Sequence, residues 1–106
     1  MNNITKVSEI TVLDLRDYLN IYEVLSSGEE NTLSNMLNIA KAYIKNYTGV
    51  NDLDEHEDFV IVALCLVQDM WDNRALYVDK TNLNKVVETI LDMHSINLLP
   101  GDEVTG

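Results

Sequence analysis

The sequence predicts an all-α protein, a small bundle of about four helices followed by a flexible C-terminal tail. Proline and glycine are scarce, with one proline and four glycines in 106 residues, so long stretches contain no residue that breaks a helix. Apolar residues recur at spacings of three and four along those stretches, which is the period of one helix face. A chain of this length is expected to form one domain, residues 1–106, with a helical core over about 11–95 and a tail over 96–106.

The first helix is expected to begin at Thr11. The Thr11 hydroxyl can cap the helix, and Asp14 stands three residues later, where a capping box has a Glu or Gln. Apolar and charged residues then separate onto two faces. The apolar face is expected to hold Val12, Leu15, Tyr18 and Leu19, and the outward face Asp14, Arg16 and Asp17.

The second helix is expected over about residues 29–47. The segment before it, residues 20–30, is predicted to be a loop because Ser26, Ser27 and Gly28 are typical of a turn. Gly49 is placed to end the helix, since glycine adopts the left-handed conformation that a helix C-terminus favours. The apolar stripe of this helix consists of Leu33, Met36, Leu37, Ala40, Ile44 and Tyr47.

The third helix is expected over about residues 55–75. Its apolar run, residues 59–67, has no polar side, which predicts burial all round. A buried strand is the alternative, because Val60, Ile61 and Val62 are β-branched. The acidic entry to the run and its continuation without a breaker favour a helix. A fourth helix is expected over about residues 82–94, with one face formed by Leu83, Val86, Val87, Ile90, Leu91 and His94.

The chain is strongly acidic, with 18 Asp and Glu against 7 Lys and Arg and a formal net charge of −11. This balance opposes non-specific binding of DNA or RNA, which depends on cations that neutralise phosphates. It equally opposes docking on an anionic membrane. The longest apolar run, residues 59–67, is far shorter than the roughly 20 residues that span a bilayer. No signal peptide is recognisable, so we expect a cytosol-like compartment.

Five acidic residues cluster around the start of the third helix: Asp52, Asp54, Glu55, Glu57 and Asp58. A calcium-binding EF-hand loop needs a glycine at its sixth position and a glutamate at its twelfth. Counted from Asp52, these positions hold Glu57 and Ala63, so the pattern fails. We expect a solvated acidic surface cluster that the helix dipole stabilises, and no metal site.

No arrangement typical of catalysis or cofactor binding is recognisable. His56 and His94 are 38 residues apart, whereas a helical zinc motif has two histidines four apart. Each histidine is therefore expected either at a helix surface or hydrogen-bonded to another residue. Cys65 is the sole cysteine, which excludes an internal disulfide, and its apolar surroundings predict a core residue. No glycine-rich phosphate loop occurs. We therefore expect no enzyme, no cofactor and no metal.

The end of the third helix is the candidate interface. Arg74 has two open interpretations: a cation that complements the helix dipole, or a fork that pairs with carboxylates of this chain or of a neighbour. Leu76 and Tyr77 follow it and are candidates for an exposed edge that faces a partner. With Asn73, these residues form the candidate contact with a second subunit or with another protein.

Several segments together point to a known family. Residues 11–19 read Thr-Val-Leu-Asp-Leu-Arg-Asp-Tyr-Leu, residues 40–44 Ala-Lys-Ala-Tyr-Ile, residues 46–49 Asn-Tyr-Thr-Gly and residues 72–74 Asp-Asn-Arg. In this order and spacing they resemble the head–tail connector family of tailed phages, also described as head-completion, adaptor or DNA-packaging proteins. The resemblance covers about residues 11–93.

The resemblance implies a structural virion protein at the head–tail interface, assembled in the host cytoplasm. Copies of it, about twelve in number, would form a ring beneath the portal protein that extends the DNA channel and docks a neck or tail-completion protein. DNA would pass without sequence-specific contacts, with the acidic cluster as a candidate channel lining, and no membrane is involved. The C-terminal part of family members holds the portal, which makes Leu98, Leu99 and Pro100 candidate contacts here. Some members carry an arginine in this stretch, whereas this chain has none after Arg74.

Two other classes of function remain open. An acidic helical DNA mimic could inhibit a nucleic-acid-binding enzyme, and it would stay a monomer or dimer with carboxylates at the spacing of phosphates. A small enzyme or metal-binding module has the least support, because no group of residues points to one.

Overall fold

The computed structural model describes residues 4–95, and this part of the chain is an all-α bundle without strands. The predicted fold class is thereby confirmed. The α-helices are α1 (Val12–Tyr18), α2 (Ser27–Thr48), α3 (Asp58–Asn73) and α4 (Lys85–Met93). Three short 3-10 helices precede α1, α3 and α4, namely η1 (Val7–Glu9), η2 (Leu53–Glu55) and η3 (Lys80–Asn82).

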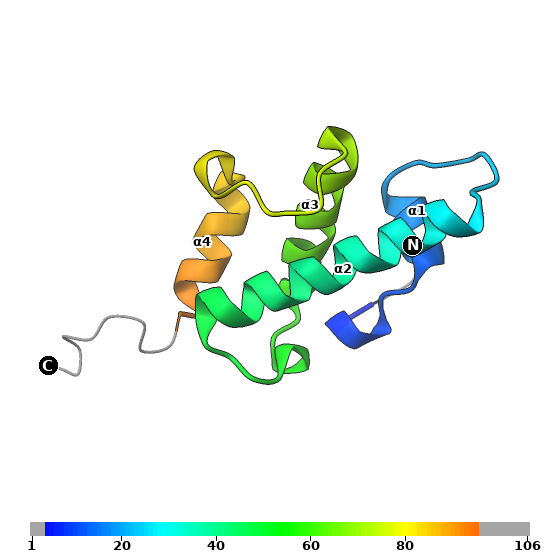
Figure 1. Ribbon diagram of the computed structural model, residues 1–106. Coiled ribbons are helices and arrows are strands. Elements are labelled where there is room, and N and C mark those ends of the chain that lie inside the picture. Colours follow the sequence, from blue (N-terminus) through cyan, green and yellow to red (C-terminus); the bar gives the residue numbers. More distant parts are fainter. Residues whose placement is uncertain (1–3, 96–106) are drawn as a thin grey trace, which may run out of the picture.

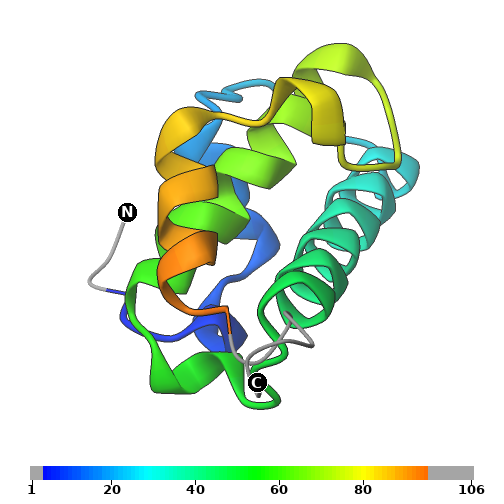
Figure 2. The same cartoon turned by 90° about the vertical axis from the view of Figure 1, so that its left-hand side faces the viewer.

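The long helix α2 organises the molecule. It runs along the whole bundle, with α1 near its N-terminal end and α4 near its C-terminal end (Figure 1). The view in Figure 2 separates α2 on one side from α3 and α4 on the other. The central helix α3 contacts α1, α2 and α4, so its apolar residues form the middle of the core. None of the helices within residues 4–95 is long and apolar enough to cross a membrane.

The capping box predicted at the first helix is confirmed. The Thr11 hydroxyl accepts a hydrogen bond from the backbone N–H of Asp14 at 3.2 Å, and the Asp14 carboxylate accepts one from the N–H of Thr11 at 2.9 Å. The prediction that Arg16 points outward is wrong. Arg16 is half-buried, and its Nη2 donates to the backbone carbonyl of Glu23 at 3.0 Å. Arg16 therefore holds the connection between α1 and α2 in place.

Helix α2 begins earlier than predicted, at Ser27 instead of residue 29. Ser26 is a helix cap and not part of a turn. Its hydroxyl accepts from the N–H of Glu29 at 3.1 Å, and Glu29 Oε1 accepts from the N–H of Ser26 at 3.0 Å, a second capping box. The predicted end is confirmed, because Gly49 has a φ of 77° and terminates the helix.

Helix α3 is shorter than predicted, and its surroundings differ. It begins at Asp58, because residues 53–55 form the separate turn η2, and it ends at Asn73. The expectation of burial all round is wrong for Ile61, which is 51% exposed, and for the half-buried Cys65. No other helix covers this side of α3 fully, so an apolar strip reaches the surface.

Helix α4 begins at Lys85, three residues after the predicted start. Asn84 caps it, with Oδ1 accepting from the N–H of Val86 at 2.8 Å. Val87 and Leu91 are buried as predicted, since they share the face that packs against α3. Val86 was expected on this face but is 56% exposed. It precedes the buried Val87 by one residue, and neighbouring residues of a helix point in different directions.

Candidate functional site

The connection that follows α3 carries the predicted interface residues, and it places them at the surface. We call Trp71, Asn73, Arg74, Leu76 and Tyr77 the α3–α4 corner. Arg74 terminates the helix with a φ of 52°, a left-handed conformation that turns the chain sharply. Leu76 and Tyr77 are 56% and 65% exposed. The remaining predicted contacts, Leu98, Leu99 and Pro100, lie outside the described residues.

The guanidinium of Arg74 is held over an aromatic ring. Its Cζ lies 4.2 Å from the centre of the Trp71 ring, a cation–π contact that orders the side chain without neutralising its charge. The side-chain amide of Asn73 donates to the carbonyl of Asp69 at 2.9 Å, which holds the Asn73 side chain against the last turn of α3. The corner thus presents an ordered cation beside two exposed apolar side chains, which is the composition of a protein-binding surface.

The connection between α1 and α2 carries a second exposed apolar surface that sequence reasoning missed. Tyr22 is 82% exposed and Val24 is 91% exposed, although both are large apolar side chains, and they lie in the segment predicted to be a loop. This connection and the end of α3 both lie on the upper side of the bundle as drawn in Figures 1 and 2. Large apolar residues between turn signals were the sequence signal that could have revealed it.

The structure divides the acidic cluster into residues that stabilise the fold and residues that face solvent. Asp52 Oδ1 accepts from the N–H of Asp54 at 3.1 Å. The Asp54 carboxylate accepts from the N–H and the hydroxyl of Ser8, at 3.0 and 2.6 Å, and so ties η1 to η2. Asp58 binds the ring of His94. Glu55 and Glu57 are exposed.

The contacts with Ser8 make stability depend on pH. These hydrogen bonds lower the pKa of Asp54 below its ordinary value, because they stabilise the carboxylate. The ionised group therefore contributes to stability above about pH 4, the value in the unfolded chain, and the contribution is lost as pH falls through the lower folded value. We expect Ser8→Ala to lower the thermal midpoint at pH 7, with a difference from the unmodified protein that shrinks as the pH falls below about 4, the ordinary value of an aspartate. A constant difference across this range, followed by circular dichroism, would contradict the assignment.

The two histidines meet, although 38 residues separate them in the sequence. The centres of the His56 and His94 rings are 4.2 Å apart, and both rings contact the edge or face of Phe59, with centres 5.2 and 4.9 Å away. His94 Nε2 lies 2.9 Å from the Asp58 carboxylate. This cluster joins the start of α3 to the end of α4. Within residues 4–95, no three His, Cys, Asp or Glu side chains are grouped so that they could hold a metal ion.

A hollow of about 630 Å³ opens beside this cluster, at the N-terminal end of α3. We call it the acidic hollow. Its apolar wall consists of Ile4, Val60, Ile61 and Leu64, and its polar rim of Glu55, His56, Glu57 and Asp58. The exposed side of Ile61 thus belongs to a concave apolar surface with carboxylates along its edge.

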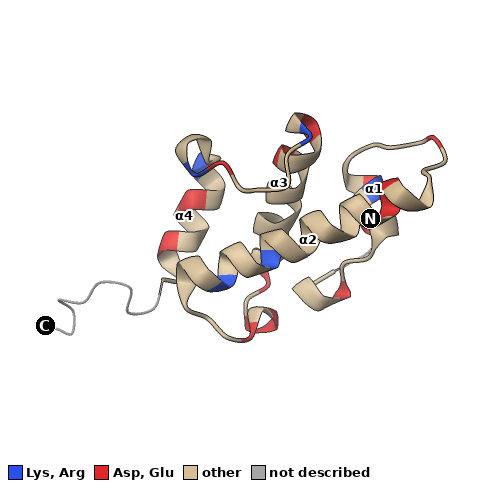
Figure 3. Ribbon diagram, viewed as in Figure 1, with Lys and Arg blue, Asp and Glu red and all other residues tan. Residues whose placement is uncertain are grey.

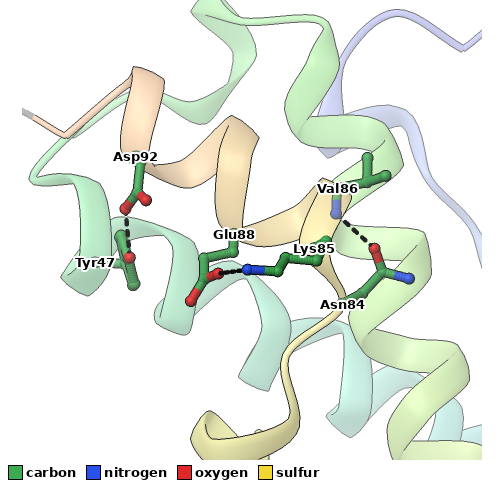
Figure 4. A network of polar contacts seen from close by, with 6 residues as sticks. All are labelled: Tyr47, Asn84, Lys85, Val86, Glu88 and Asp92. Atoms are coloured by element: carbon green, nitrogen blue, oxygen red, sulfur yellow. Dashed lines mark hydrogen bonds and ion pairs between the residues drawn. The ribbon is translucent and has the colours of Figure 1, made fainter.

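Polar contacts fasten α4 to the C-terminal end of α2 (Figure 4). The Tyr47 hydroxyl of α2 donates to Asp92 Oδ1 of α4 at 2.5 Å. Within α4, Lys85 Nζ lies 3.8 Å from Glu88 Oε1, an ion pair between residues three apart. The hydrogen bond to Asp92, aided by partial burial, raises the pKa of Tyr47 to about 12, because the neutral phenol is the donor. Tyr43, Asn46 and Lys80 line a neighbouring hollow of about 450 Å³ with Tyr47.

The raised pKa of Tyr47 yields a prediction at alkaline pH. Folding favours the neutral phenol, so this contribution is complete below about pH 10 and is lost as pH rises through the folded value near 12. We expect Tyr47→Phe to cost at most about 1 kcal/mol at pH 7, since the bond faces solvent, and to reduce the stability lost between about pH 10 and 12. Urea unfolding of both proteins at pH 7 and at several values between about pH 10 and 12 measures these free energies. If the variant loses as much stability at alkaline pH as the unmodified protein, the assignment to Tyr47 is contradicted.

The lone cysteine lies where α1 meets α3 and not in the deepest part of the core. Cys65 is half-buried, and its Sγ is 3.7 Å from the Tyr18 hydroxyl. Burial, with the contact to Cys65, raises the pKa of Tyr18 to about 12. The predicted core role thus holds only in part, because one side of Cys65 reaches the surface strip of α3.

Comparisons with protein-family models, with curated proteins and with solved structures find no match to this chain.

Proposed function

We propose that the protein is a structural head–tail connector of a tailed phage. It forms a ring under the portal, extends the DNA channel and docks the next neck or tail protein. The observation that carries the proposal is the exposure of large apolar side chains on two connections between helices, namely Tyr22, Val24, Leu76 and Tyr77. Exposed apolar side chains of this size are suited to protein contacts. The sequence resemblance supplies the identity of the partners.

The charge of the protein supports passage of DNA through such a ring. Acidic residues are spread over the helices and connections, whereas Lys and Arg are few (Figure 3). With a charge of −11 per copy, a ring of about twelve copies would carry on the order of −130 before counterions. Phosphates are repelled by such a lumen, so DNA slides without sticking. The solvent-facing Glu55 and Glu57 are candidates for surface charge, since Asp52, Asp54 and Asp58 bind groups of their own chain.

The proposed role involves no reaction, and the protein would act in the virion after assembly in the host cytoplasm. Its partners would be further copies of itself, the portal protein and a downstream neck or tail-completion protein. The high negative charge also suits the acidic DNA mimic. That class is separated from a connector by its small oligomers and by its target, a nucleic-acid-binding enzyme.

Native mass spectrometry with portal rings tests the proposal. The purified chain is mixed with the assembled portal protein of the phage whose genome encodes it. We expect a complex of one portal ring with about twelve copies of this chain. Portal rings that stay bare at a large excess of the chain would contradict the proposal. A stable complex with a nucleic-acid-binding enzyme, formed without the portal, would favour the mimic.

A further inference from the structure

The two exposed features of α3 lie at its opposite ends. The acidic hollow surrounds the first two turns, and the α3–α4 corner follows the last residue. A helix of 16 residues is about 24 Å long. Figure 1 places the two ends of α3 at the bottom and top of the bundle. The corner therefore cannot reach the hollow of its own copy.

The acidic hollow has the chemistry to accept a side chain that is partly apolar and partly cationic. Ile61, 51% exposed, extends an apolar wall that Val60 and Leu64 continue into the core. Glu55 and Glu57 are exposed at its rim. Carboxylates beside an apolar wall favour a guanidinium, which pairs with carboxylates through a planar fork and is weakly hydrated.

The α3–α4 corner offers this combination on the same chain. Arg74 is exposed and ordered by Trp71, and Leu76 and Tyr77 stand beside it. The exposed Lys85, by contrast, forms an ion pair with Glu88 of its own helix.

We infer that the α3–α4 corner of one copy docks into the acidic hollow of the next copy, a contact that rests on the proposed function because a ring requires one. Arg74 faces Glu57 and Glu55, while Leu76 and Tyr77 cover the apolar wall. Since the two surfaces differ, the contact is head-to-tail. Repeated head-to-tail contacts close into a ring when the rotation between successive copies divides a full turn.

A copy of this chain fits the hollow better than its own C-terminal segment does. Residues 96–106 contain Asp102 and Glu103 and no Lys or Arg. Their charge is repelled by Glu55 and Glu57, whereas that of Arg74 is attracted. Charge complementarity therefore favours the α3–α4 corner of another copy over residues 96–106 as the occupant of the acidic hollow.

Charge reversal tests the contact. The variants are Glu57→Arg in the hollow, Arg74→Glu in the corner, and both together. Sedimentation from about 10 µM to about 1 mM covers the affinities expected of a modest contact. We expect the unmodified chain to form species larger than a dimer, and either single reversal to weaken association at least about tenfold, because like charges then face each other. The double variant, and an equal mixture of the two single variants, should recover association, since both restore opposite charges at every contact. Helix content by circular dichroism serves as the folding control.

Disulfide trapping gives a second measurement that does not depend on affinity. Ile61→Cys and Tyr77→Cys are combined in a Cys65→Ser background, and mild oxidation should yield a ladder of covalent oligomers. Either cysteine alone should yield no species beyond a dimer. A monomer at all concentrations together with no ladder, or a double variant that fails to recover association, would overturn the contact.

The outcome is distinguishable from that of the proposed function. Chains that self-associate as predicted but leave portal rings bare would support this contact and contradict the connector role. The opposite outcome is a chain that binds portal rings while the two single charge-reversal variants bind them and self-associate just as the unmodified chain does. That outcome would overturn this contact and leave the connector role intact.

Discussion

Replacing Phe59 with alanine is expected to lower the free energy of unfolding by about 3–5 kcal/mol. The Phe59 side chain is fully buried, and its ring contacts both His56 and His94. The substitution removes the apolar contacts and leaves a cavity at the junction of α3 and α4. Because small domains are stable by only about 5–15 kcal/mol, this loss is a large fraction of the total.

Urea unfolding followed by circular dichroism measures this effect, with Ile61→Ala as a matched control. Ile61 lies two positions from Phe59 on the same helix but is 51% exposed, so we expect its loss to stay within about 1 kcal/mol. Equal losses in the two variants would show that Phe59 is not enclosed as described.

Replacing Asp58 with alanine is expected to cost about 1.5–3 kcal/mol, the range for hydrogen bonds that involve a charged group. The change removes the partner of His94 Nε2, at 2.9 Å, and the side chains of His94 and Asp58 are only 19% and 36% exposed. It also removes a carboxylate from the first turn of α3, where the helix dipole favours it. The end of α4 should loosen first.

The matched control for Asp58 is Glu55→Ala, which removes an exposed carboxylate of the same cluster. We expect that control to change stability by no more than about 0.5 kcal/mol. Hydrogen exchange at the end of α4, measured beside urea unfolding, should increase in Asp58→Ala alone. Two variants with the same stability and exchange would mean that the pair does not fasten α4.

Local sequence signals predicted the helix ends where one residue determines the geometry. Thr11 with Asp14, and Gly49, act within a single turn, so the sequence was sufficient for both. The start of α2 was misplaced because serine and glycine are common in turns and also at caps. The reciprocal hydrogen bonds of Ser26 and Glu29 decide between these two roles.

The remaining features depend on how helices pack, which no local pattern reveals. His56 and His94 meet only because the start of α3 lies beside the end of α4. Ile61 looked like a core residue because the whole run around it is apolar, but no helix covers it. The acidic hollow combines both effects, so it could not be predicted from the sequence.

The most direct test of the connector role is electron microscopy of particles assembled without this chain, from the phage genome that encodes it with the gene inactivated. We expect filled heads that lose their DNA and do not join tails, and we expect the added purified protein to restore both. Particles that keep their DNA and carry tails in its absence would contradict the role.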